Sequence, residues 1–249
     1  MSVDTRVVVG LGNPGEKYRY TRHNIAWLIL DAFADRVNWR GGGKERDASM
    51  VHAGRVLGLD LVVAKPITYM NESGIAVRKL LAADRVSIDR LLVVVDDFSL
   101  PFGRLRFREG GSDGGHNGLA SIEAELQTDR YPRLRVGIGD PSDSGGAHQH
   151  VLNEFSAAER LRIPEVARAS RRIARVADCH VADQIVQEGR EGDEIDVHGE
   201  QDQLDLHQDN DQVLAVQEDA DHRQREQQAR QQELRTFHCR SPVDSVVLG

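Results

Sequence analysis

Apolar residues in the first two thirds of the chain fall into two alternating kinds of run. Short continuous runs, rich in β-branched residues, are typical of strands that are buried on both faces. Two further runs flank Gly58-Leu59-Asp60, which predicts a hairpin. We therefore predict strands over residues 6–11, 51–57, 61–65, 91–95, 103–108 and 133–138.

The other runs have apolar residues at three- and four-residue spacing, which indicates amphipathic helices. They cover residues 22–37, 71–84 and 117–126. Ser156 and Glu159 have the spacing of a capping box, which begins a helix that Pro164 should interrupt before a further helical segment over about 166–176. Strands and helices interleave, so we predict an α/β fold in a single domain over residues 1–178.

The composition changes after residue 178. Residues 179–249 contain twelve Gln, ten Asp, seven Glu, five His and one aromatic residue. They hold 6 Lys and Arg against 17 Asp and Glu, whereas residues 1–178 hold 26 against 23. The net charge of -8 therefore comes from the tail, and the domain itself is slightly basic. So little apolar surface cannot offset the entropy lost on folding, and we expect the tail to be disordered or an isolated polar helix.

The remaining composition limits the class of protein. No run of about 18 apolar residues suits a membrane span, and the N-terminus has no leader pattern. The two cysteines, Cys179 and Cys239, have no metal-ligand spacing. We expect a cytoplasmic protein without disulfides, metal, cofactor or membrane partner. The irregular histidines of the tail do not change that expectation.

Gly10, Gly12 and Gly15 form a Gly-x-Gly-x-x-Gly pattern between a strand and a helix, as in dinucleotide-binding proteins. That motif also needs an acidic residue about 20 positions later, at the end of a second strand. Asp31 and Asp35 fall inside the predicted helix instead. A tight turn that uses glycine for its backbone is an equally good interpretation.

Polar residues that would meet if the strand ends converge are the main candidates for chemistry. They are Asn13, His23, Asn71, Asp96 and Asn117. His23 titrates near neutral pH, and a carboxylate such as Asp96 would fix its tautomer. Asparagine amides can donate to an oxyanion. No serine or cysteine has a nucleophile motif, so this set favours attack by water. From residue types and positions alone, packing of His23, a turn at Asn13 and a backbone contact of Asp96 are the commoner explanations.

Arginines alternate with apolar residues over 104–108, and Arg133 and Arg135 repeat the pattern. The two-residue period of a strand would place Arg104, Arg106 and Arg108 on one face. Such a face could bind phosphates or could simply be solvated.

Several blocks of sequence, taken together, resemble bacterial peptidyl-tRNA hydrolases. They are Gly10-Leu-Gly-Asn-Pro-Gly15, Tyr18, Thr21-Arg-His-Asn24, Lys65-Pro66, Thr68-Tyr-Met-Asn71, Ser73-Gly74, Asp96-Asp97, Leu100-Pro101, Gly103, Gly114-Gly-His-Asn-Gly-Leu119 and Arg133-Leu-Arg-Val-Gly-Ile-Gly139. The resemblance covers residues 6 to about 176 and implies a single domain with a mixed, twisted sheet between helices. It also implies hydrolysis of the ester between peptide and tRNA. Separately, we expect the chain to act as a monomer.

The resemblance also assigns residues. His23 would activate water and Asp96 would orient it. Asn13, Tyr18, Tyr69, Asn71 and Asn117 would hold the peptide and the tRNA 3′ end, and Arg108 and Arg135 would clamp the tRNA 5′ phosphate.

Three positions depart from the family pattern. Asp140 adds a negative charge near the supposed phosphate clamp, Ala26 stands where glycine is common, and the tail replaces the second half of a C-terminal helix. A reading-frame change or an unrelated extension would explain the tail. A module that binds tRNA but has lost activity through its altered C-terminus therefore stays open as the alternative function.

Overall fold

The computed structural model describes residues 5–39, 43–56, 58–141 and 145–169. The predicted tail, and the helical segment expected after residue 169, lie outside the described residues. The strands are β1 (Arg6–Gly10), β2 (Lys44–Arg46), β3 (Ser49–Val56), β4 (Leu59–Pro66), β5 (Leu91–Asp97), β6 (Leu105–Arg108) and β7 (Arg133–Gly137). The helices are α1 (Ile25–Arg36), α2 (Ser73–Asp84), α3 (Asn117–Leu126), α4 (Ala147–Leu152) and α5 (Ala157–Ala169).

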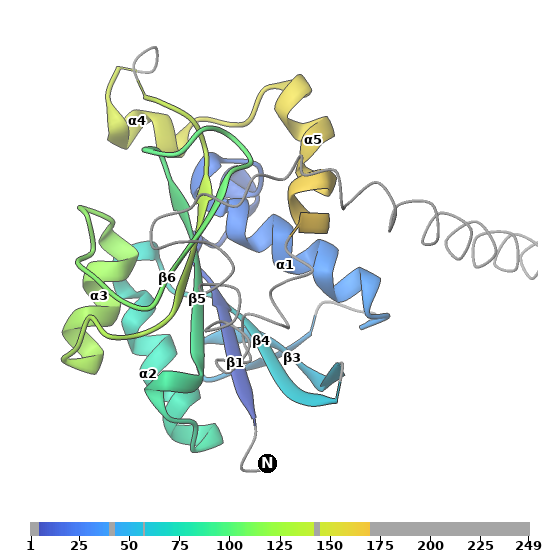
Figure 1. The fold of residues 1–249 in the computed structure, drawn as a ribbon, viewed down its shortest axis with the longest axis vertical. Coiled ribbons are helices and arrows are strands. Elements are labelled where there is room, and N and C mark those ends of the chain that lie inside the picture. Colours follow the sequence, from blue (N-terminus) through green and yellow to red (C-terminus); the bar gives the residue numbers. More distant parts are fainter. Residues whose placement is uncertain (1–4, 40–42, 57, 142–144, 170–249) are drawn as a thin grey trace, which may run out of the picture. The chain divides into compact units, whose positions relative to one another are not determined.

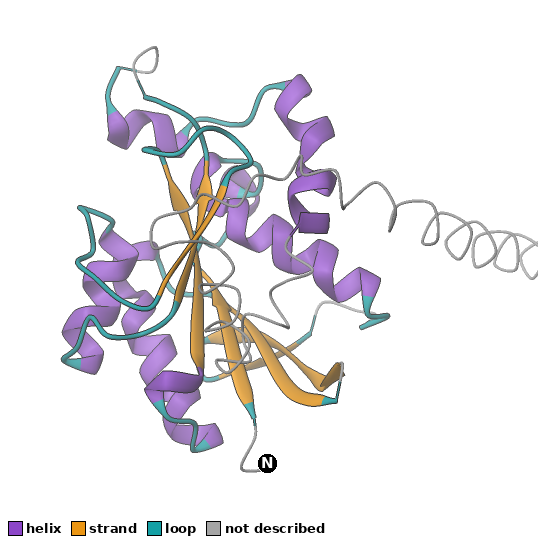
Figure 2. Cartoon of the chain, in the orientation of Figure 1, coloured by secondary structure: helices purple, strands orange, loops and turns teal. Residues whose placement is uncertain are grey.

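The strands form one mixed sheet in the order β2-β3-β4-β1-β5-β7-β6. The central strands β4, β1, β5 and β7 run parallel, whereas β2, β3 and β6 pair antiparallel at the two edges. The strands twist across the sheet (Figure 2). This confirms the predicted α/β fold with a mixed, twisted sheet between helices.

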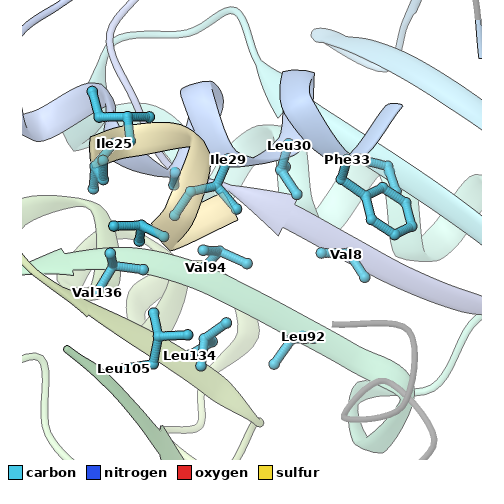
Figure 3. Close-up of a cluster of buried hydrophobic side chains, with 14 of the residues drawn as sticks. Val8, Ile25, Ile29, Leu30, Phe33, Leu92, Val94, Leu105, Leu134 and Val136 are labelled. Atoms are coloured by element: carbon cyan, nitrogen blue, oxygen red, sulfur yellow. The ribbon is translucent and has the colours of Figure 1, made fainter. Parts of the chain in front are cut away.

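Helices cover both faces of the sheet (Figure 1). On one face, α1 and α5 pack against alternate residues of the central strands, among them Val8, Leu92 and Val94. Figure 3 shows the α1 side chains facing these strand residues. On the other face, α2 and α3 cover Val7, Val9 and their neighbours. Because both faces are buried, the central strands appear in the sequence as continuous apolar runs. Each buried aliphatic side chain contributes roughly 1.5–3 kcal/mol to the stability of the fold.

Several predicted boundaries differ from the structure; the helix predicted over 71–84, for example, begins with a 3-10 turn, η3 (Met70–Glu72), before α2. The 22–37 helix begins with a 3-10 turn, η2 (Arg22–Asn24), before α1. The 103–108 strand starts at Leu105, because Gly103 has a positive φ of 84° and bonds the Gly137 carbonyl in a turn. Pro164 does not interrupt α5. The ring removes only one N–H, while the burial of Ile163 and Val166 on either side holds the helix to the core.

Two short elements, β2 and α4, have no signal in the hydrophobic pattern. β2 is an edge strand of three polar residues, and α4 has six residues with one buried side chain, His150. The predicted capping box is present: the Ser156 amide donates to the Glu159 carboxylate at 2.7 Å, and the Glu159 amide donates to Ser156 Oγ at 3.2 Å. In the described part of the chain, no helix is long and apolar enough to cross a membrane.

Candidate active site

His23 lies in the turn that connects β1 to α1. After Gly10 the chain passes through two 3-10 turns, η1 (Glu16–Tyr18) and η2, before α1 begins. His23 is the central residue of η2 and only 7% exposed. The turn therefore holds an imidazole at the carboxyl end of β1, where polar groups gather in open α/β sheets.

Asp96 faces His23 from the carboxyl end of the neighbouring strand β5. Its carboxylate is buried, with Oδ1 at 2.9 Å and Oδ2 at 3.0 Å from His23 Nδ1. β1 and β5 are adjacent and parallel, so their ends bring together residues 73 positions apart. The structure thus shows the predicted contact between the histidine and the carboxylate. This contact occupies His23 Nδ1, so Nε2 is the nitrogen that can accept a proton.

A second histidine, His116, shares this carboxylate. Its Nε2 lies 3.0 Å from Asp96 Oδ1, and the two imidazole rings are 4.9 Å apart. His116 also caps α3: its Nδ1 accepts hydrogen bonds from the amides of Gly118 and Leu119 at 3.1 and 3.3 Å. A nitrogen that accepts these bonds must carry a lone pair, so the proton of His116 is on Nε2 and is donated to Asp96.

These bonds give the two histidines different chemistry. Protonating His116 at Nδ1 would direct a new N–H at two amide N–H groups, so His116 is a neutral donor to the carboxylate. His23 has its proton on Nδ1 and a lone pair on Nε2. Among the described residues, His23 is hydrogen-bonded to Asp96 and to no serine or cysteine. His23 is therefore the candidate base, and water the candidate nucleophile.

The charges of the site favour this assignment. Burial lowers the pKa of His23, but the charge and hydrogen bond of Asp96 outweigh burial and raise that pKa above 6.5. Burial raises the pKa of Asp96, and the interactions with the two neighbouring imidazoles lower it by more, to well below the ordinary 3.8. The carboxylate is thus ionised throughout the physiological range.

A metal ion fits this group of residues poorly. The donor atoms of His23, Asp96 and His116 lie within 4.8 Å of one another, which is the one such group in the described residues. A metal at His116 Nε2 would need a lone pair there, so the proton would have to move to Nδ1, against the two α3 amides. The tautomer of His116 therefore suits a hydrogen-bond donor to the carboxylate and not a metal ligand.

Asn13 is held beside this group by a buried network. Its amide N–H donates to Asn24 Oδ1 at 2.8 Å, and Asn24 Nδ2 donates back to the Asn13 carbonyl at 2.9 Å. The Met70 amide donates to Asn13 Oδ1 at 2.9 Å. Because the oxygen of the Asn13 side chain is engaged, its Nδ2 group is the part that can donate to a ligand.

Asn71 and Asn117, two of the other predicted contact residues, lie on segments that meet near Asn13. Met70 leads to Asn71, and Gly118 follows Asn117; a Cβ built on Gly118 would meet Met70 and Leu11. The segments that carry the three asparagines therefore converge. Asn71, Asn117 and Tyr69 are exposed and Tyr18 is half-buried, so these side chains are accessible to a ligand.

The arginines of β6 and β7 differ in their surroundings. Arg106 pairs with Arg135, and Arg108 with Arg133, across the two strands. Arg108 is exposed, whereas Arg135 Nε lies 2.9 Å from Asp97 Oδ2. A Cβ on Gly114 would lie 3.5 Å from Arg135 Nη2, so Arg135 reaches the loop that leads to His116.

Arg133 corrects the prediction that β7 repeats the basic face. It is 1% exposed and donates to the carbonyls of Ser112 and Asp129 at 3.2 and 2.9 Å, with its guanidinium over the Tyr131 ring. Arg133 does lie in strand β7, as the two-residue period predicts, but residues that precede β7 in the chain cover its side chain.

Sequence reasoning missed two residues, His116 and Asn24. His116 follows two glycines and precedes a helix, a position where a cap is expected, and that was the available signal. Asn24 could not be found in this way, because its bonds to Asn13 depend on how the β1–α1 connection folds back.

Comparison with known proteins finds related sequences and similar structures. Residues 7–192 match the family model for peptidyl-tRNA hydrolase. The chain is 42% identical to the peptidyl-tRNA hydrolase of Aquifex aeolicus over 164 residues, covering 66% of this chain and 85% of that protein. It is 43% identical to that of Chloroflexus aurantiacus over 186 residues, covering 74% and 93%. The crystal structure of peptidyl-tRNA hydrolase from Acinetobacter baumannii superimposes with a TM-score of 0.61 and 29% identity, covering 74% of this chain and 92% of that one.

Proposed function

Because this chain belongs to the peptidyl-tRNA hydrolase family and hydrolyses the ester bond of peptidyl-tRNA, we propose that His23 is the general base that activates water for this reaction. The observation that carries the proposal is the hydrogen bond between His23 Nδ1 and the buried Asp96 carboxylate. It fixes the tautomer in which Nε2 holds the lone pair, and it stabilises the positive charge that forms on the ring.

The reaction then needs two proton transfers at one nitrogen. A water molecule attacks the ester carbonyl carbon while its proton moves to His23 Nε2, and the carbonyl oxygen becomes an oxyanion. The tetrahedral intermediate breaks its bond to the ribose oxygen, which takes the proton from Nε2. Peptide and tRNA leave with free carboxyl and hydroxyl groups, and His23 is neutral again.

Asp96 acts on His23 rather than on the water. Both carboxylate oxygens lie within hydrogen-bond distance of His23 Nδ1, and His116 donates to Oδ1. These contacts support a role in fixing the tautomer, and they leave the water to other groups. His116, as a neutral donor, keeps the carboxylate in place while it caps the helix that begins with Asn117.

The amides and the basic strands suit the two ends of the substrate. The free Nδ2 group of Asn13 can donate to a carbonyl or to the oxyanion, and Asn71 and Asn117 present further amides from neighbouring segments. Tyr18 and Tyr69 offer accessible rings to the 3′ nucleotides. Arg108 lies on β6 opposite Arg133, and Arg135 is two residues further along β7. Together, Arg108 and Arg135 would bind a phosphate of the tRNA.

Location and assembly follow from the substrate only as proposals. Peptidyl-tRNA arises during translation, which supports a cytoplasmic protein. That the chain works as a monomer stays a prediction, and its molar mass in solution, from light scattering, would test it.

The direct experiment measures peptide release from peptidyl-tRNA by the whole chain and two variants. We expect His23→Ala to reduce release by about 10²–10⁴-fold while tRNA binding stays within a few-fold of the original. His148→Ala removes an exposed histidine on α4 and should leave release unchanged. Equal turnover by the two variants would disprove the proposal. Tight tRNA binding without ester cleavage by the original chain would instead favour the binding module, an alternative that the relatives' names do not support.

A further inference from the structure

Arg22, the residue before His23, ties the η2 turn to the start of α5. Its Nη2 lies 3.0 and 2.9 Å from the two carboxylate oxygens of Glu159, and its Nη1 donates to the Glu154 carbonyl at 2.6 Å. The two side chains are only 13% and 23% exposed. Solvent therefore screens this ion pair less than a surface ion pair. Because two nitrogens of the planar guanidinium are bonded, the orientation of the Arg22 side chain is fixed as well as its distance from Glu159.

The backbone around Arg22 is joined to the same segment. The Arg22 amide donates to the Asn153 carbonyl at 3.0 Å, and the Phe155 amide donates to the Tyr20 carbonyl at 3.1 Å. Thr21 and Glu154 form an antiparallel bridge. Beneath the guanidinium lies the buried ring of Phe155, 5.3 Å away. Residues 20–22 and 153–155 therefore form one short paired unit, which the Arg22 side chain closes.

Glu159 links this unit to the helix behind it. The carboxylate that binds Arg22 also accepts the Ser156 amide in the capping box of α5. Further along α5, Ile163 and Val166 are buried in the core with α1. The helix that backs Arg22 is thus anchored at both the cap and the core, and it offers a rigid support.

We propose that Arg22 is a positioning residue, which holds the η2 turn against α5 and so keeps His23 directed at Asp96. A three-residue 3-10 turn has weak hydrogen bonds of its own and needs such support. Small displacements of a base are costly, because proton transfer requires it at hydrogen-bond distance from the water. The inference rests on the proposed role of His23 and adds the residues that place it.

Three variants of the whole chain separate positioning from helix stability. Arg22→Met keeps the apolar stem of the side chain but removes its hydrogen bonds. Glu159→Gln removes the charge of the partner but keeps a residue that can complete a capping box. Ser156→Ala is the matched control, since it weakens the cap of the same helix and leaves the Arg22–Glu159 pair in place.

We expect Arg22→Met to lower kcat by about 10- to 100-fold, with KM within about twofold, because the pair holds the turn that carries the base and acts only through that turn. The NMR titration midpoint of His23 should fall to lower pH as the ring loses part of its contact with Asp96. Glu159→Gln should shift both quantities in the same direction by less, and Ser156→Ala should shift neither.

Two results would overturn the inference. One is that Arg22→Met has the same kcat and the same His23 titration midpoint as Ser156→Ala. The other is that Glu159→Gln changes neither kcat nor the His23 midpoint. If Arg22→Met does not fold, the Glu159→Gln result decides alone. The titration midpoint is read from the ring itself, so a wrong assignment of the base, visible as normal release by His23→Ala, is distinguishable from a wrong assignment of Arg22.

Discussion

Replacing Asp96 by asparagine changes one atom of the carboxylate that both histidines share. Oδ1 accepts from His23 Nδ1 and from His116 Nε2 at 2.9 and 3.0 Å, while Oδ2 lies 3.0 Å from His23 Nδ1. In Asp96→Asn the new NH₂ group occupies one of these positions and meets an N–H. His23 can relieve the conflict by moving its proton to Nε2, which is the nitrogen that must accept a proton from water.

The expected loss is therefore that of the general base. Such catalysis contributes about 10²–10⁴-fold, so kcat should fall by a factor in that range, which corresponds to about 2.7–5.5 kcal/mol in the activation barrier. Because the substitution leaves the proposed substrate-contact asparagines and tyrosines unchanged, KM should change much less than kcat.

The pH dependence of activity tests the same contact independently. The base must be neutral, so activity is lost as pH falls through the pKa of His23, which Asp96 holds above 6.5. Asp96 itself is ionised throughout this range, because its own pKa is lowered. Without the carboxylate charge, burial of His23 dominates, so the acid limb of the residual activity in Asp96→Asn should move to lower pH.

The assay is peptide release at saturating peptidyl-tRNA from about pH 5 to 9, with the melting temperature of the variant as the control for folding. An acid limb at the original pH would refute the reasoning, since it would show that the titrating group does not contact Asp96. A kcat within threefold of the original would refute the assigned tautomer.

Three further predictions concern the remaining parts of the structure. Asn13→Asp should lower kcat by about 10²–10³-fold in the release assay, because the free donor is replaced by an acceptor, and an unchanged kcat would exclude Asn13 from the oxyanion site. Arg108→Ala should weaken tRNA binding and reduce the slope of affinity against salt by about 1, with kcat at saturation preserved; an unchanged slope would remove the phosphate contact. Gly137→Ala should cost more than about 3 kcal/mol of unfolding free energy in a denaturant titration, because its Cβ would lie 1.9 Å from the Pro101 carbonyl oxygen; a stable variant would show that the turn can move.

The hydrophobic pattern predicted the layers of the fold because both faces of the central strands are buried. Val7, Val8 and Val9 are all fully buried, with Val8 against α1 and the other two on the side of α2 and α3. A strand of that kind is visible in a sequence as an unbroken apolar run. The edge strand β2, with exposed and half-buried polar residues, follows no such rule and was missed.

The contact between His23 and Asp96 could be predicted because His23 follows β1 and Asp96 lies at the carboxyl end of β5, and the carboxyl ends of adjacent parallel strands lie together. The sharing of Asp96 with His116 could not, since it depends on the path of the glycine-rich loop before α3. The opposite failure concerns Arg133, where the strand period is right but a covering segment buries the side chain. Periodicity gives the face of a strand, and only the fold shows whether that face is covered.

The claim that His23 is the base is tested most directly by measuring its ionisation twice in the same unmodified chain. The acid limb of kcat/KM reports a pKa of the free enzyme, and the NMR signal of the His23 ring reports the pKa of that residue in the same state. We predict that the two midpoints coincide, at a pH above 6.5. A His23 titration that is separated from the acid limb by a full pH unit would contradict the account.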